Sequence, residues 1–283
     1  MAAIYLQQLL LSQRGANTKM EIIIKEIRKD LAIEFIQKYH YSNILPKLTK
    51  YYLGYFENEI LIGIVTLGWG TQPLGTIRNI FKNHSLTTKD YLEIGKMCFL
   101  PNKNNSNYGS KMISILVKWL KQKDILFLYT LADGIMGKCG YVYQASNFVY
   151  IGSFETQVYM DRLTKEKIHP RSAKKLIREN EKLANKKLCW LTSDFCEFKE
   201  IDKITGIMFR YVYPLNKKAK KIFDTYAEYK NKKNPKNADL KFKKRVANGK
   251  TINIEMPSFD MNANFHNSQK PELSQMKLFQ EVL

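Results

Sequence analysis

The strongest constraint on the fold is an apolar run, ILFLYTLA at residues 125–132, that stops at Asp133 and Gly134. Such a run is typical of a strand that is buried on both faces of a sheet. A polar, Asn-rich loop and a helix precede it, which predicts a strand–helix–strand unit with two parallel strands. Asp133 is therefore expected at the carboxyl edge of the sheet, where open α/β sheets bind their ligands.

The remaining segments predict a mixed α/β fold, with a central antiparallel hairpin joined to this parallel unit. Strands are expected at residues 20–27, 49–70 (the hairpin), 90–101, 125–132, 148–161 and 206–215, and helices at 28–41, 102–124, 138–147 and 169–187.

The net charge of +20 predicts an acidic partner, of which nucleic acid is the commonest. The excess is concentrated late in the chain: residues 216–250 carry 13 Lys/Arg and 3 Asp/Glu, and residues 165–187 carry 9 and 3. With interleaved aromatic side chains such as Phe223 and Tyr226, a nucleic-acid surface and a merely solvated charged face are equal alternatives.

Three segments are expected along the chain. Residues 1–19 are interpreted as a flexible leader, residues 20–215 as the catalytic domain, and residues 216–283 as a basic, partly irregular extension. No apolar run is long enough to span a membrane, and the first residues lack the charge and cleavage pattern of a signal peptide. The four cysteines form no CxxC pair, which favours reduced thiols and a cytoplasmic location.

Six stretches, in this order, resemble the phage Mom family within the GNAT acyltransferase fold. They are YHYSNILP (39–46), EIGKMCFLP (93–101), NYGS (107–110), ADGIMGKCGYVYQASNFVYIG (132–152), HPRS (169–172) and FRYVYPL (209–215). The resemblance covers residues 20–215 and implies a GNAT-like central mixed sheet flanked by helices. It does not extend to the C-terminal segment.

The resemblance implies a transferase that adds a small acyl or carbamoylmethyl-type group to the N6 amine of adenine in DNA. Such a modification protects phage DNA from host restriction, and a phage-encoded enzyme would act in the host cytoplasm. The implied donor is acyl-CoA-like or another activated acyl compound. The chain departs from the family at Lys138, where a histidine is usual, and at Lys96, where arginine is frequent. The usual GNAT pyrophosphate loop is also reduced to one glycine, Gly109.

Asp133 has two interpretations. It caps the following turn, as Asp before Gly often does, or it accepts a hydrogen from the poorly nucleophilic N6 amine. In the second case the neighbouring glycines would let the backbone approach a flat base.

His40 and Tyr41 follow the first predicted helix. His40 either stabilises the end of that helix or acts as a general base or metal ligand, with Tyr41 stacking or hydrogen bonding in the site. Iron stays an open alternative because His40 and nearby tyrosines could ligate it.

Asn107, Gly109 and Ser110 lie where the Asn-rich loop becomes a helix. Asn107 or Ser110 either caps this helix or, with the helix N–H groups, polarises the donor's carbonyl. We therefore expect these three residues to bind the donor.

The predicted substrate contacts are residues of the family motifs. Tyr143 is expected mainly in the core, while Gln144 and Asn147 could bind an adenine edge. The remaining candidates for DNA contacts are Lys96, Lys138 and Arg171. Because a base inside a duplex cannot reach a sheet edge, we expect double-stranded DNA with the adenine extruded.

Two other functions compete with DNA modification. One is a GNAT acyltransferase acting on another amine, in an RNA base, a protein or a small molecule. The other is a nucleic-acid-binding protein without catalysis. The sequence leaves the oligomeric state open, a dimer included.

Overall fold

The computed structural model describes residues 21–262, except 43, 83, 104–105, 171–172, 229–230, 247–248 and 261. The predicted leader at 1–19, the candidate Arg171 and the end of the extension at 263–283 lie outside the described residues.

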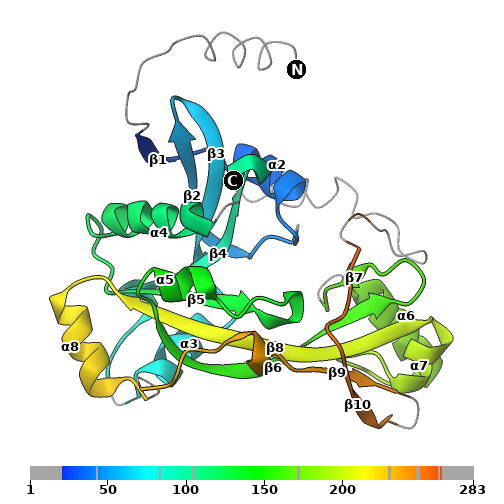
Figure 1. Ribbon diagram of the computed structural model, residues 1–283. Helices are drawn as coiled ribbons and strands as arrows, with labels where there is room; N and C mark the ends of the chain where they lie inside the picture. The colour runs from blue at the N-terminus through cyan, green and yellow to red at the C-terminus, as the bar shows by residue number, and fades with distance from the viewer. Residues whose placement is uncertain are drawn as a thin grey trace, which may run out of the picture.

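A mixed β-sheet runs through the molecule (Figure 1). Its strands follow the order β1-β2-β3-β4-β5-β8-β6-β7, and β9 and β10 continue it beside β8. The strands are β1 (Ile22–Glu26), β2 (Leu48–Glu57), β3 (Ile60–Trp69), β4 (Tyr91–Phe99), β5 (Phe127–Asp133), β6 (Val149–Asp161), β7 (Lys167–Ile168), β8 (Ile201–Pro214), β9 (Phe242–Arg245) and β10 (Thr251–Ile254).

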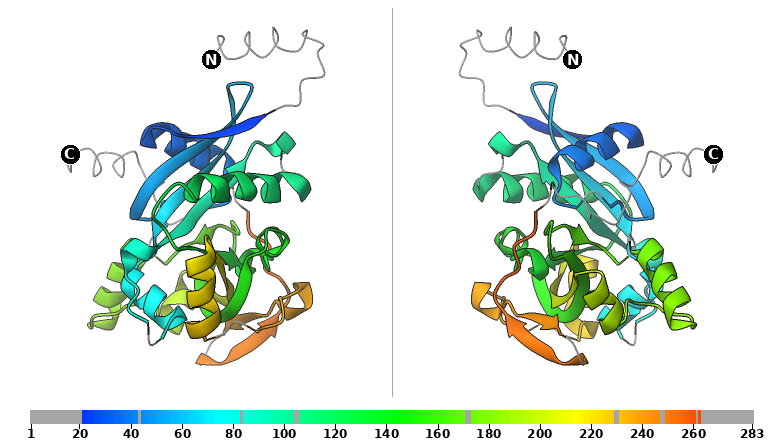
Figure 2. Two further views of the ribbon diagram at one scale, coloured as in Figure 1. Left: turned by 90° about the vertical axis from the view of Figure 1, so that its left-hand side faces the viewer. Right: turned by 90° about the vertical axis from the view of Figure 1, so that its right-hand side faces the viewer.

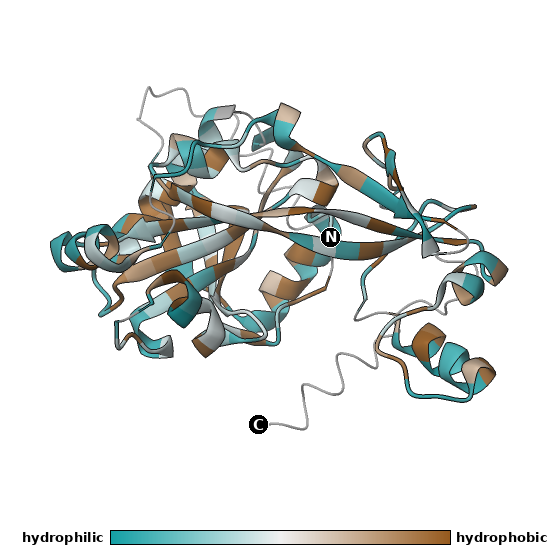
Figure 3. Ribbon diagram, turned by 90° about the horizontal axis from the view of Figure 1, so that it is seen from below, coloured by the Kyte–Doolittle hydropathy of each residue, from teal (hydrophilic) through white to brown (hydrophobic). Residues whose placement is uncertain are grey.

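Helices cover both faces of this sheet. They are α2 (Lys29–Tyr39), α3 (Pro73–Ile80), α4 (Ser106–Leu120), α5 (Tyr141–Ala145), α6 (Lys174–Ala184), α7 (Ser193–Phe198) and α8 (Lys217–Tyr226). The largest core cluster lies under α4 and α5, while α2, α3 and α8 pack on the opposite face. In Figure 3 hydrophobic residues follow the strands and the inner sides of the helices. The predicted mixed α/β sheet flanked by helices is confirmed. None of the described helices has the length and apolar character to cross a bilayer.

The described part of the C-terminal extension packs onto the domain. Ala219, Ile222 and Phe223 of α8 belong to the core cluster beneath α3. β9 pairs with the start of β8, and residues 251–254, which were expected to be irregular, form β10. Figure 2 shows these orange strands at the end of the molecule remote from β1.

The predicted parallel pair is present, and its two strands part before they end. β4 pairs with β5 only from Tyr91–Phe127 to Ile94–Thr130. Gly95 then forms a bulge opposite β3, where a Cβ atom would meet Pro46 and Thr66. Such a bulge re-aims the strand that carries it. β4 continues beside β3, and β5 continues beside β8 as far as Asp133. The parting lies at the carboxyl ends of both strands.

Candidate active site

The segment that follows α2 bridges the parted ends of β4 and β5. Ser42 accepts a hydrogen bond from Lys96 of β4 at 2.9 Å. Tyr41 lies beneath Lys138, whose Nζ is 4.0 Å from the centre of the phenol ring, a cation–π contact. His40 stacks on the same ring with a centroid distance of 4.3 Å. The site therefore gathers predicted residues from three segments around Tyr41.

Asp133 forms the carboxylate side of this site. Its Oδ2 is 3.0 Å from Lys167 Nζ of β7, and the two side chains are 15% and 9% exposed. Asp133 precedes the short 3₁₀ turn Gly134–Met136, yet its side chain makes no cap hydrogen bond. The capping interpretation is therefore wrong. Oδ1 accepts no hydrogen bond from the residues that the structure describes.

The carboxylate is less open than the sequence predicted. Asp133 lines neither the hollow at Arg162, Lys203 and Arg245 nor the one at the Gly95 bulge. Lys167 occupies Oδ2, so a ligand would have to bind at Oδ1.

Burial and the positive charge of neighbouring lysines keep His40 neutral. Burial first, then the charges of Lys96 and Lys138, lower the pKa of His40 to about 3. The backbone N–H of Ser42 points at Nδ1 at 2.9 Å. The carbonyl oxygen of Ser42 lies at the same distance from Nδ1, so the Ser42 backbone engages this ring nitrogen through both of its polar groups. His40 is thus a neutral imidazole held by Nδ1, and its role as a general base stays a prediction.

Tyr41 is a protonated phenol in this setting. Burial, followed by the negative charge of Asp133, raises the pKa of Tyr41 far above its usual value. The phenol can donate a hydrogen bond and present its ring, but it does not ionise near neutral pH.

The donor set fits a metal cation poorly. The described residues contain no group of three His, Cys, Asp or Glu side chains that could hold a metal ion. Nδ1 of His40 is already engaged, and the charges of Lys96, Lys138 and Lys167 bear on its ring. These ammonium groups would repel a cation. We derive no step through iron.

The residues predicted to bind the donor are placed by packing at the start of α4. This helix begins at Ser106, so neither Asn107 nor Ser110 is its N-cap. Ser110 donates to the Asn107 carbonyl at 3.2 Å. A Cβ atom on Gly109 would lie 2.6 Å from Val142 of α5, so this glycine allows two helices to meet. Their role in donor binding stays a prediction.

The three α5 candidates differ in their surroundings. Tyr143 packs against Phe148 and Tyr211, as expected of a core residue. Gln144 donates to the Tyr211 hydroxyl at 2.9 Å and to the Pro235 carbonyl at 3.0 Å, so its amide fastens the C-terminal extension. Asn147 is exposed in the left-handed turn that ends α5, with φ of 62°. Adenine recognition by these residues stays a prediction.

The glycines behind Asp133 contact the protein itself. A Cβ atom on Gly134 would collide with the Ile207 carbonyl of β8. Gly140 has φ of +91° and lies against the ring of Tyr211. The expectation that they admit a flat base is therefore wrong at these two positions, where the close approach is to β8.

Sequence reasoning missed residues that the fold brings to the site. Lys167 is the main one, and its place two residues before the HPRS motif was the available signal. Residues 256–260 are another: Phe259 lies 5.6 Å from Lys167 Nζ, and Met256 lies against Gly137. No sequence pattern links that segment to Asp133, because the contact depends on the path of the chain after β10.

Comparisons with known proteins agree with the order of these motifs. Residues 21–236 match the model of the Mom protein family. The methylcarbamoylase mom of Escherichia phage Mu is 30% identical over 141 residues, which cover 49% of this chain and 57% of the relative. The chain thus spans little more than half the length of this curated relative.

Solved structures with some likeness are GNAT-type acetyltransferases. An IAA acetyltransferase from Bacillus cereus has a TM-score of 0.38 and 13% identity, covering 69% of this chain and 99% of its own. A Bacillus subtilis acetyltransferase in complex with CoA has a TM-score of 0.37 and 10% identity, covering 70% and 100%. Likenesses at this level do not define a donor site.

The match to the family model includes every described residue from His40 to Lys167 around Tyr41 and Asp133. The match spans most of the chain, and the phage Mu relative carries the name of this family. The chain belongs to the Mom protein family.

Proposed function

We propose that this protein modifies the N6 amine of adenine in DNA, using Asp133 to bind and deprotonate the amine. The observation that carries the proposal is a family member's carboxylate at the end of β5, with one oxygen paired to Lys167 and its charge acting on the buried Tyr41. The name of the phage Mu relative, a methylcarbamoylase, supports transfer of a small acyl-like group.

The chemistry needs a fixed acceptor because the N6 lone pair is delocalised into the purine ring. Asp133 Oδ1 would accept one N6 hydrogen, which orients the base. As N6 bonds to the donor's carbon, the bond from that carbon to its leaving group breaks, and an N6 proton passes to Asp133. Lys167 would hold the carboxylate in position before the transfer.

The surrounding groups would serve the donor and the base. With its proton on Nε2, neutral His40 would offer that hydrogen, and Tyr41 would offer its hydroxyl, to an oxygen that gains negative charge during transfer. Lys96 and Lys138 add positive charge for an anionic donor, which we propose to be acyl-CoA-like or another activated acyl compound. The adenine would be extruded from double-stranded DNA, and the modified DNA would resist host restriction.

The test is mass spectrometry of nucleosides from cells that express the chain. We expect a modified deoxyadenosine with the unchanged protein and a loss of at least about a hundredfold with Asp133→Asn, which keeps shape but is a poor base. Asp194→Asn, at an exposed carboxylate in the first turn of α7, is the matched control.

Three results would count against the proposal. Modified deoxyadenosine that persists in Asp133→Asn would remove Asp133 from the chemistry. A modified ribonucleoside beside unmodified deoxyadenosine would favour an RNA acyltransferase. DNA binding without any modified nucleoside in the unchanged protein would favour a binding protein.

A further inference from the structure

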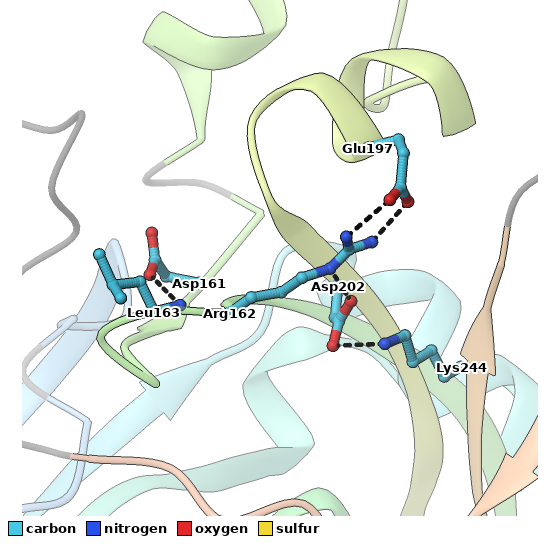
Figure 4. Close-up of polar contacts among 6 residues, drawn as sticks. All are labelled: Asp161, Arg162, Leu163, Glu197, Asp202 and Lys244. Atoms are coloured by element: carbon cyan, nitrogen blue, oxygen red, sulfur yellow. Dashed lines mark hydrogen bonds and ion pairs between the residues drawn. The ribbon is translucent and has the colours of Figure 1, made fainter.

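A second cluster of cations lies between α7, β8 and β9. It surrounds a hollow whose polar lining includes Arg162, Lys203 and Arg245. Arg162 is already paired with Glu197 and Asp202, and Lys244 takes the other oxygen of Asp202 at 2.9 Å (Figure 4). The two carboxylates of this region are therefore neutralised within the fold.

Lys203 and Arg245 are left without a carboxylate among the described residues. They are direct partners in the antiparallel β8–β9 ladder, so their side chains leave the same face of the sheet. Like charges directly opposite each other destabilise a sheet. Lys203 is also only 8% exposed, and a buried, unpaired ammonium is costly.

The surroundings of Lys203 reflect this cost. Burial, followed by the charge of Arg245, lowers the pKa of Lys203. The folded chain thus holds two adjacent cations at a cost in folding free energy. An anion bound in the hollow would offset this cost.

We propose that this hollow binds a phosphate group of the DNA backbone, an assignment that rests on the proposed function for the identity of the polymer. Guanidinium and ammonium groups on one face suit a phosphate, with Arg245 able to bind two oxygens at once. Trp190, 56% exposed, lies 5.9 Å from Lys203 Nζ and offers a ring for an unstacked base.

The phosphate site is separate from the Asp133 site. Tyr159 of β6 pairs with Ile168 and Lys203, whereas Met160 pairs with Lys167 and Asp202. Opposite partners share a face, so Lys203 and Lys167 lie on opposite faces of the sheet. The hollow therefore acts as an anchor for DNA beyond the reacting base, and its loss should weaken binding without altering the chemical step.

The test measures binding of a fluorescently labelled DNA duplex to the full chain across a salt series. We expect Lys203→Gln combined with Arg245→Gln to lower the affinity about tenfold, and to reduce the slope of log affinity against log salt by about 0.9, the value for one phosphate contact. Lys118→Gln on α4, combined with Lys121→Gln directly after this helix, removes the same charge elsewhere and is the α4 control. Lys203→Arg keeps the cation and should retain binding.

Further measurements separate the two proposals. Asp133→Asn removes no phosphate contact and should keep the full salt slope of DNA binding, whereas the Lys203/Arg245 double variant should need about tenfold more DNA for half-maximal modification of adenine. Equal loss of DNA binding in the double variant and the α4 control would overturn the anchor. The anchor would also be overturned if the double variant bound CoA, the phosphate-bearing probe for the donor, more weakly while its DNA binding stayed unchanged. If the double variant unfolds, loss of DNA binding in Lys203→Arg, which keeps the cation, would likewise overturn it.

Discussion

Two clusters of cations lie on opposite faces of the same sheet, and they differ in what neutralises them. Around Tyr41, each lysine has a partner inside the fold: Lys96 has Ser42, Lys138 has a phenol ring, and Lys167 has Asp133. Between β8 and β9, Lys203 and Arg245 face each other with no described carboxylate. In our proposals, the first arrangement orients groups for chemistry, whereas the second holds charge available for a phosphate. The comparison teaches that a large net charge says little until each cation's partner is known.

The largest expected effect is on the paired cluster. Lys167→Met leaves Asp133 largely buried without its counter-charge, which should lower the free energy of unfolding by about 3 kcal/mol. Chemical denaturation measures this, with Lys165→Met as an exposed control two residues away. Adding Asp133→Asn to Lys167→Met should restore part of the loss; no recovery would mean that the pair is not what stabilises this region.

A slightly smaller loss is expected where the Asp133 loop meets β8. Gly140→Ala puts a Cβ atom at positive φ against the Tyr211 ring, and should cost about 2 kcal/mol of unfolding free energy. Gly75→Ala, in α3 and free of close contacts, should leave stability equal or raise it. Equal thermal midpoints for both variants would show that the loop does not need this close packing.

The pH dependence of stability tests whether His40 is held neutral. Its pKa is about 3 in the folded chain and near 6.5 when unfolded, so the unfolded chain binds more protons between these values. Stability from this group is therefore complete above pH 6.5 and is lost as the pH falls, by at most about 2 kcal/mol between pH 7 and 5.

His40→Gln should remove this component, so the comparison of both proteins by urea denaturation isolates it. Glu166 acts in the opposite direction, because burial and Asp161 raise its pKa to about 7 and its contribution falls as the pH rises from 4.5. Identical pH profiles for the two proteins would mean that His40 titrates normally.

The smallest effect concerns the unpaired cluster and has the opposite sign. Lys203→Met removes a buried like-charge contact and should raise the free energy of unfolding by about 1 kcal/mol. Lys244→Met, the neighbour that does have a carboxylate, should lower it. If both substitutions destabilise to the same extent, Lys203 has an internal partner and the contrast between the two clusters disappears.

Elements whose signal is local were predicted well. The apolar run at 125–132 became β5, the hairpin turned at Asn58 and Glu59, and the Asn-rich segment led into α4. β9 was missed because FKKR lacks the apolar alternation of a half-buried strand, and β10 because TINI alternates over only four residues in a polar segment. β9 is a strand because the edge of β8 offers it backbone partners, which propensity does not report.

The residues of the candidate site also divide into those with a local sequence signal and those that only the fold brings to the site. His40, Tyr41, Lys138 and Asp133 were predicted from their motifs, and the fold brings them together. Lys167 was missed although it lies two residues before the HPRS motif, and Phe259 was missed because its segment has no signal of its own. Gly134 and Gly140 were correctly singled out, but their neighbour is β8.

By itself, the sequence determined the mixed sheet, the placement of Asp133 at a carboxyl strand edge and the family of the chain. These follow from apolar periodicity and from motif order, both of which are properties of neighbouring residues. Only the tertiary structure decided which cations are neutralised, because ion pairs such as Asp133–Lys167 and the opposition of Lys203 and Arg245 join residues far apart in the chain. Strand register sets those pairings, and register depends on the whole sheet.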